Sequence, residues 1–206
     1  MLGLRLRQFL GRPDLAVLAL PRDGVPVGRE VAHVLHAPFD VFVVRKLRLP
    51  EDPGFTLGAI ASGGIRVLND DVLAWSCPSA DVLDAMTRME EEELTLLERV
   101  YRGGRSAINI AGRIVILVDQ GAGTGSTMRA AALAVSRLKP SRIVVALPVA
   151  SAAACALLRD VADEVVCLFT PEPFSTVRRW YLECPPTTDE DVRRLLIGEA
   201  AIDKVA

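Results

Sequence analysis

The sequence has little of what marks several classes of protein. Aromatic residues make up 5% of the chain and 24 Lys and Arg stand against 26 Asp and Glu, so no basic stripe interleaved with aromatic rings is present. Because nucleic acids are bound largely through neutralisation of their phosphates, this composition argues against a nucleic-acid partner. An apolar run of about 18 residues and an N-terminal hydrophobic signal are also lacking, which predicts no membrane partner and a cytoplasmic location.

Metal-ligating patterns are equally scarce. The four cysteines lack the C-x-x-C spacing of zinc sites and are interpreted as reduced thiols: Cys77, Cys155, Cys167 and Cys184. His33 and His36 lie three residues apart on a predicted helix, but no third ligand accompanies them, so they are interpreted as surface or packed histidines. The sequence therefore predicts no metal site built from protein ligands alone.

What the sequence does contain is a series of short apolar runs. The 206-residue chain is 50% apolar and 24% charged, and a chain of this length buries about 70% of its unfolded surface without disulfides. The runs are rich in Val, Ile and Leu and nearly continuous, which is typical of strands buried on both faces of a parallel sheet. They occupy residues 15–20, 40–47, 113–119, 142–149 and 164–169.

Predicted helices separate these runs, at residues 26–36, 80–102, 126–138, 151–161 and 189–204. The acidic run from Glu90 to Glu93 is interpreted as the solvated face of its helix. Because strands and helices alternate, residues 1–206 are predicted to form one α/β domain with a doubly wound, mostly parallel sheet flanked by helices. Residues 48–64 are expected to form a flexible loop or a hairpin arm, and residues 168–188 a small irregular C-terminal cap.

The motif that carries chemistry follows the run 113–119. It reads DQGAGTGST from Asp119 to Thr127, so glycines that allow close backbone approach alternate with hydroxyl side chains. The next predicted helix directs its N-terminal N–H groups and the positive end of its dipole into this loop, which favours a phosphate group. The loop is not a Walker P-loop, because no lysine precedes its Ser/Thr residues, and the alternative is a tight turn that holds no ligand.

Beyond this chemistry, the segment VILVDQGAGTGSTM resembles the phosphoribosyl diphosphate (PRPP) signature of type I phosphoribosyltransferases. That signature is a hydrophobic run, an acidic pair and a small-residue loop. VLALPRDGVPVGREVA resembles the first strand and diphosphate-binding loop of the same family, and FVVRKL with GFTLGAIASGG resembles its next strand and flexible loop. TPEPFSTVRRWY and TTDEDV resemble the C-terminal region of a bacterial group of phosphoribosyltransferase-domain proteins. The likeness extends from about residue 15 to residue 195.

The resemblance implies the type I phosphoribosyltransferase fold and a PRPP-dependent glycosyltransferase of nucleotide metabolism. Diphosphate would be displaced from the anomeric carbon by a nitrogen nucleophile, with Mg²⁺ held mainly by diphosphate oxygens, ribose hydroxyls and water. Asp119 and Gln120 would hold the ribose, with Asp119 also able to reach the metal through a water molecule. The 5′-phosphate would lie against Gly121, Ala122, Gly123, Thr124, Gly125, Ser126 and Thr127.

The diphosphate group has its own implied site. The resemblance places it at the loop from Pro21 to Val25, which contains Arg22, Asp23 and Gly24. Arg45 and Lys46, at the end of FVVRK, would be cations that face it. The residues with implied catalytic roles are Asp119, Gln120, Arg22 and Lys46. Catalysis would then consist mostly of positioning, neutralisation of the leaving group and a negative field near the ribosyl cation.

Two residues depart from the family pattern. Gln120 stands where the family has a second acid, which weakens a ribose hydrogen bond by about 1 kcal/mol. Asp23 stands where the related group usually has glycine, and a carboxylate about 5 Å from a diphosphate charge repels it by roughly 3 kcal/mol. The alternative hypothesis is therefore a catalytically weakened or non-catalytic regulatory protein that binds PRPP or a nucleotide. A hydrolase of phosphorylated sugars is a third hypothesis, for which no nucleophile or base is evident.

The sequence does not identify the acceptor. Purines, pyrimidines and small amines or amides all remain open, because acceptor choice is expected to reside in the irregular cap. Trp180 and Tyr181 in that cap either stack on a planar base or pack the cap against the sheet. Proteins of this fold commonly pair, so a homodimer is an expectation that the sequence does not decide.

Overall fold

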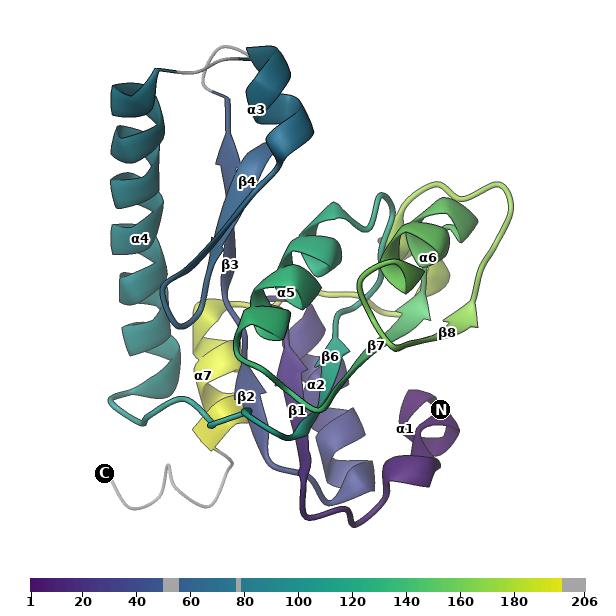
Figure 1. Cartoon of the computed structure of the whole chain (residues 1–206). Helices are drawn as coiled ribbons and strands as arrows, with labels where there is room; N and C mark the ends of the chain where they lie inside the picture. The colour runs from purple at the N-terminus through teal and green to yellow at the C-terminus, as the bar shows by residue number, and fades with distance from the viewer. Residues whose placement is uncertain (50–55, 77–78, 198–206) are drawn as a thin grey trace.

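The centre of the molecule is a five-stranded parallel sheet. The structure is a computed structural model that describes residues 1–49, 56–76 and 79–197 (Figure 1). The strand order is β2-β1-β6-β7-β8, with every neighbouring pair parallel, which confirms the predicted sheet. β1 and β6 are buried along their whole length, which explains why their sequences are continuously apolar. The strands are β1 Leu15–Ala19, β2 Phe39–Val41, β6 Ile114–Val118, β7 Arg142–Val149 and β8 Glu164–Phe169.

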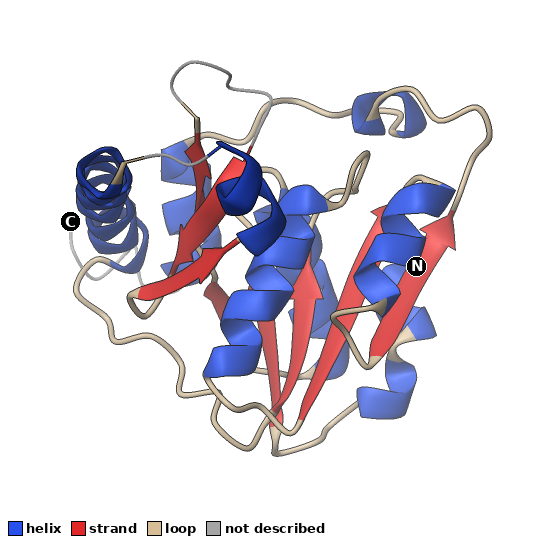
Figure 2. Ribbon diagram, turned by 45° about the horizontal axis from the view of Figure 1, so that its top comes forward, coloured by secondary structure: helices blue, strands red, loops and turns tan. Residues whose placement is uncertain are grey.

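Helices cover both faces of this sheet (Figures 1 and 2). Helices α1 and α2 pack on one face and helices α5 and α6 on the other, which confirms the predicted doubly wound arrangement. Because successive side chains of a strand point to opposite faces, Ile116 of β6 belongs to the core under α2 and Leu117 to the core under α5. The helices are α1 Leu2–Arg5, α2 Gly24–Leu35, α5 Ser126–Arg137 and α6 Ala152–Arg159.

A second, antiparallel sheet stands beside the main one (Figure 2). Its strand order is β3-β4-β5, with bounds β3 Val44–Arg48, β4 Thr56–Ala61 and β5 Ile65–Leu68. The run 40–47 was predicted as one strand, but it divides between β2 of the main sheet and β3 of the second sheet. Of the segment 48–64, expected to be a flexible loop or a hairpin arm, residues 56–61 form β4, while residues 50–55 lie outside the described residues.

Three further helices pack around the second sheet: α3 Asp70–Ser76, α4 Ala80–Arg102 and α7 Asp189–Ile197. Leu94 of α4 and Leu196 of α7 share a core with Leu47 and Leu57 of the second sheet. The helix predicted to end at residue 204 is described as far as Ile197, and its remaining residues lie outside the described range. Within that range, no helix is both long and apolar enough to cross a membrane.

A buried ion pair fixes the end of α4 to β2, and sequence reasoning assigned it no role. Arg102 Nε lies 3.2 Å from Asp40 Oδ1, and the Arg102 and Asp40 side chains are only 8% and 7% exposed. The same guanidinium donates to Glu98 Oε1 at 2.6 Å and to the carbonyl of Val41 at 2.9 Å. Asp40 also accepts the backbone N–H of Ile108 at 3.1 Å. The pair therefore joins α4, β2 and the chain that leads into β6.

Candidate functional site

The loop between β6 and α5 is anchored to the end of β7. The backbone N–H of Ala122 donates to Val149 O at 3.0 Å, and Ser151 Oγ donates to Gly123 O at 2.6 Å. A Cβ at Gly121 would lie 2.6 Å from Val149 O, so glycine is needed for this close approach. The loop is thus held by backbone and by Ser151, which leaves its hydroxyl side chains available.

The free side of this loop has the features of an anion site. Thr124 Oγ1 and Ser126 Oγ lie 3.1 Å apart at the start of α5. Gly125 precedes the helix with a φ of 75°, a conformation that favours glycine. The first N–H groups of α5 therefore open toward the loop together with the hydroxyls, an arrangement that suits a phosphate.

A lysine reaches this loop from the second sheet. Lys46 Nζ of β3 donates to Ser126 Oγ at 2.6 Å, so the loop has a cation that its own sequence lacks. Burial is the main cause of a lowered pKa for Lys46, and nearby Arg48 contributes to it. The family resemblance places Lys46 at the diphosphate, whereas its ammonium group contacts the loop expected to hold the 5′-phosphate.

Arg45, the neighbour of Lys46 on β3, has a different partner. Its Nε lies 2.6 Å from Glu90 Oε2 of α4. The interpretation of Glu90 as part of a solvated face is therefore wrong, because its carboxylate is committed to this ion pair. Arg48 joins Arg45 and Lys46 around a cavity of about 650 Å³ that Thr127 also lines. We call this space the basic cavity.

Asp119 lies directly after β6, at the carboxyl edge of the sheet. Its Oδ1 accepts the backbone N–H of Gln120 at 2.7 Å. The carboxyl keeps some contact with solvent, but the protein surrounds it closely. Burial, aided by the charge of Asp23, raises the pKa of Asp119 to about 7. A Cβ at Gly24 would lie 2.9 Å from both Asp119 Cα and Asp119 Oδ1, so the segment 21–25 packs directly on this acid.

The segment 21–25 contains a cis peptide bond between Pro21 and Arg22. The Arg22 side chain is 58% exposed, and its Nε lies 3.6 Å from Asp189 Oδ1 of α7. The same Asp189 oxygen accepts the hydroxyl of Tyr101 at 2.7 Å. Arg22 is thus directed along the edge of the site by a carboxylate on the C-terminal helix.

Asp23 and Gln120, the two departures from the family pattern, both contact the C-terminal cap. Asp23 is the residue before α2, yet among the described residues its Oδ1 accepts the backbone N–H of Thr187 at 3.0 Å and does not cap α2. Gln120 Nε2 donates to Cys184 Sγ at 2.5 Å. Its backbone carbonyl accepts the hydroxyl of Tyr181 at 2.6 Å. Together these three hydrogen bonds hold segment 181–187 over the two loops of the site.

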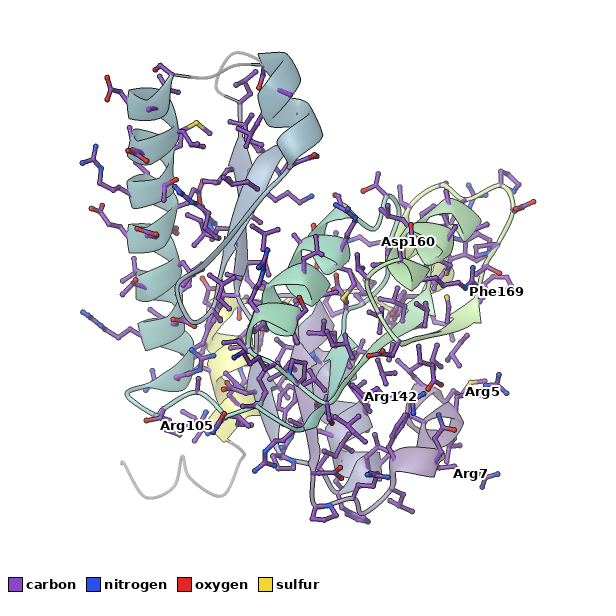
Figure 3. All side chains as sticks on the ribbon, in the orientation of Figure 1. Arg5, Arg7, Arg105, Arg142, Asp160 and Phe169 are labelled. Atoms are coloured by element: carbon purple, nitrogen blue, oxygen red, sulfur yellow. The ribbon has the colours of Figure 1, made fainter. Side chains whose placement is uncertain are left out.

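The two aromatic residues of the cap, Trp180 and Tyr181, have different contacts. The rings of Trp180 and Phe169 meet edge to face, with centroids 5.1 Å apart. Phe169 ends β8 at the outer edge of the sheet (Figure 3), so Trp180 packs the cap against that edge. Tyr181 points to Gln120 in the site. Of the two expected roles, the structure shows packing for Trp180.

Sequence reasoning missed the partners that the site draws from distant segments. Ser151 lies between β7 and α6, Cys184 and Thr187 lie in the cap, and Asp189 begins α7. Thr187 is 164 positions from Asp23. A periodic pattern or a local motif could not reveal these contacts, because they arise only when distant segments meet in the folded chain. Among the described residues, no group of three or more His, Cys, Asp or Glu side chains is placed to hold a metal ion.

An acid and a loop rich in glycine and hydroxyl side chains at the carboxyl edge of a parallel sheet form an arrangement suited to a phosphorylated ligand. The sequence profile of the phosphoribosyl transferase domain family matches residues 4–175. The chain belongs to this family.

Known relatives agree with this assignment. Two Mycobacterium tuberculosis proteins, from strains CDC 1551 and H37Rv, carry names that provisionally assign them as phosphoribosyl transferases. Each is 42% identical over 191 residues, which is 93% of this chain and 43% of the relative. The chain thus spans less than half the length of these relatives. The crystal structure of TT1426 from Thermus thermophilus is 39% identical, with a TM-score of 0.83 over 95% of this chain and 94% of that one.

Proposed function

We propose that the protein transfers the 5-phosphoribosyl group of PRPP to a nitrogen nucleophile and releases diphosphate. The observation that carries the proposal is the junction of Asp119 with the loop 121–127, where Lys46 supplies a cation to Ser126. A ligand with a phosphate next to a ribose fits this order of groups, because the anion site and the acid follow each other at one edge of the sheet. Family membership supports the same reaction class.

Each part of PRPP has a place in this proposal. The 5′-phosphate lies in the loop 121–127, against the Thr124 and Ser126 hydroxyls and near Lys46. Asp119, with Gln120 beside it, holds the ribose hydroxyls. Arg22 and the backbone at Gly24 face the diphosphate, with the basic cavity adding positive potential from Arg45, Lys46 and Arg48.

The reaction exchanges one bond for another. The lone pair of the acceptor nitrogen forms a bond to the anomeric carbon. The bond from that carbon to the diphosphate oxygen breaks, and its electron pair leaves with diphosphate. The nitrogen then loses a proton to solvent. Because positive charge develops on the ribose, the carboxylate of Asp119 stabilises the transition state electrostatically when it is ionised.

Mg²⁺ fits this site as a companion of the substrate. The described residues offer carboxylates at Asp119 and Asp23 but no cluster of three ligating side chains. Such a donor set suits an ion that keeps water and takes most of its oxygens from diphosphate and ribose, with Asp119 reached through water. When bound, the ion would neutralise charge on the leaving group.

A second candidate is a regulatory protein that binds PRPP or a nucleotide without turnover. It is favoured by one observation: the side chains of Asp23 and Gln120, in the two loops of the site, are already bonded to the cap. The two candidates differ in whether diphosphate appears.

The experiment that tests the proposal has two stages. Calorimetric titration with PRPP, with and without Mg²⁺, is expected to show Mg²⁺-dependent binding. Release of diphosphate is then measured with purine, pyrimidine, amine and amide acceptors. Binding with diphosphate release supports the transferase, and binding without release from any acceptor supports the regulatory candidate. Absence of PRPP binding would overturn the transferase, and absence of both PRPP and nucleotide binding would overturn the regulatory candidate as well.

Lys46 gives a specific prediction for the 5′-phosphate. The change Lys46→Gln removes a charged hydrogen-bond donor from the loop, so the affinity for ribose 5-phosphate is expected to fall by about ten- to one-hundredfold. Calorimetry of ribose 5-phosphate measures the change. Arg137→Gln removes a charge from the other end of α5 and is the matched control, with affinity expected within about twofold. Equal affinities for the Lys46→Gln and Arg137→Gln variants would place the phosphate elsewhere.

A further inference from the structure

A second cavity lies under the C-terminal cap. It has a volume of about 460 Å³ and is bounded by α2, α7 and the cap segment 181–187. Pro26, Val27 and Leu195 give it an apolar wall. Its polar lining includes Asp23, Gln120, Tyr181, Glu183, Asp191 and Arg194. We call this space the cap cavity.

The cap cavity has a surplus of negative charge. Asp191 is neutralised, because one oxygen lies 3.0 Å from Arg194 Nη2 and the other accepts the Thr188 hydroxyl at 2.6 Å. Among the described residues, the bond that Asp23 accepts is the backbone N–H of Thr187 at Oδ1, and Oδ2 has no partner there. Within the part of the chain that the structure describes, neither Asp23 nor Glu183 forms an ion pair. Two carboxylates without a cation therefore remain at this cavity.

The basic cavity has the opposite charge. Among the described residues that line it, Arg45, Lys46 and Arg48 stand against one acid, Glu90, so these residues leave a positive surplus next to Thr127 of the loop 121–127. The cap cavity thus has a negative surplus and the basic cavity a positive one. Anionic groups of a ligand are favoured on the side of β3 and disfavoured under the cap.

The cap cavity also opens onto the place of reaction. Gln120 and Asp23 both line it, and both belong to the loops that carry the proposed ribose and diphosphate contacts. Gly24 packs on Asp119, which places Asp23 beside that acid. A molecule in the cap cavity would therefore lie next to the proposed place of the ribose, and Lys46 is not among the residues that line this cavity.

We propose that the cap cavity binds the acceptor and selects one that presents N–H groups or positive charge to Asp23 and Glu183. Such an acceptor carries no carboxylate or phosphate group, because an anion would face two unneutralised carboxylates. The attacking nitrogen belongs to an amine, amide or amino-substituted ring. This inference rests on the proposed function, since it names the substrate class of the same site.

The test uses probes of one shape and three charges. Benzamidine, benzamide and benzoate share a planar ring and carry a positive, neutral or negative substituent, and they have no nucleophilic ring nitrogen. Binding of each to protein saturated with ribose 5-phosphate is followed by ligand-observed NMR. The expected order of affinity is benzamidine, then benzamide, then benzoate, with about tenfold or more between the first and the last. Nicotinamide is expected to exceed nicotinate in the same way.

Charge-removing variants assign the preference to the cap cavity. Asp23→Asn keeps an oxygen for the Thr187 N–H but removes the charge, and Glu183→Gln does the same at the other side. Each is expected to reduce the ratio of benzamidine to benzoate affinity by about threefold or more. Glu91→Gln removes a charge from the distant outer face of α4 and is expected to leave the ratio unchanged.

The outcomes separate this inference from the proposed function. Equal affinities across the three charges, a preference for benzoate, or no binding of any probe would overturn the inference while PRPP binding still supported the transferase. A preference that persists unchanged in both Asp23→Asn and Glu183→Gln would also overturn it, by placing the probes elsewhere. Failure of ribose 5-phosphate and PRPP to bind would overturn both proposals.

Discussion

The change Asp119→Asn is expected to stabilise the ligand-free protein at pH 8 while reducing diphosphate release by about 10²- to 10³-fold. Both effects have one cause: the carboxylate is closely surrounded by protein, and its charge costs free energy until a cationic transition state offsets it. Burial raises the pKa of Asp119 to about 7. An asparagine retains an oxygen for the N–H of Gln120 but carries no charge. Thermal unfolding and a diphosphate assay measure the two effects.

The size of the stability effect depends on pH. The folded pKa of Asp119 lies above the ordinary value of 3.8, so between these values the folded state binds more protons than the unfolded state. The free energy of unfolding therefore falls as pH rises from about 4 to 7, and above 7 the deficit is on the order of 2–4 kcal/mol. Asp119→Asn removes that deficit at pH 8.

Measurement at pH 3.5, below both pKa values, is the control, because Asp119 is then mostly protonated in both the folded and the unfolded state. The gain in stability should be absent there. A loss of stability at pH 8 would contradict the prediction, since it would mean that contacts of the ionised carboxylate outweigh the cost of its burial.

The second large effect is expected at the ion pair between α4 and β2. Arg102→Met should lower the free energy of unfolding by about 3–5 kcal/mol, because the Asp40 carboxylate would remain buried without its cation. Urea unfolding with an unchanged m-value would measure it.

Two further variants show whether the buried charge is responsible. Arg66→Met breaks an exposed pair with Asp84 at 3.8 Å and should cost less than about 1 kcal/mol. Adding Asp40→Asn to Arg102→Met removes the unpaired charge and should recover part of the loss. A double variant less stable than Arg102→Met would show that the effect comes from packing and not from charge.

The sequence predicted the main sheet because buried parallel strands are written as continuous apolar runs. β1, β6, β7 and β8 each coincide closely with one of these runs. The run 40–47 misled for the same reason: apolar residues serve β2 and β3 alike, and composition does not show that the chain passes from one sheet to another between them. β5 and α3 were not predicted, because their short segments lack a clear period.

The sequence indicates the part of the candidate site whose residues are contiguous in the chain. It does not indicate the contacts that distant segments make in the folded protein. Glycines, hydroxyls and an acid within 119–127 predict a phosphate-binding loop without knowledge of the fold. The cation for that loop comes from Lys46, 80 positions away. Asp23 and Gln120 oppose PRPP binding when they are considered alone, but the structure pairs both with the cap. These roles arise from tertiary contacts, and no periodicity encodes them.

The hydrogen bonds between the cap and the two site loops involve cap residues that the family profile does not cover. The family profile ends at residue 175, whereas Tyr181, Cys184 and Thr187, the cap residues that bond to the two site loops, all lie beyond it. The part of the chain that the profile covers thus contains the whole loop 121–127 and Asp119. The part outside it forms the roof of the cap cavity. Substitutions in the cap segment 181–187 would change which acceptors the cap cavity binds. The strands of the sheet, which the family profile covers, would stay unchanged.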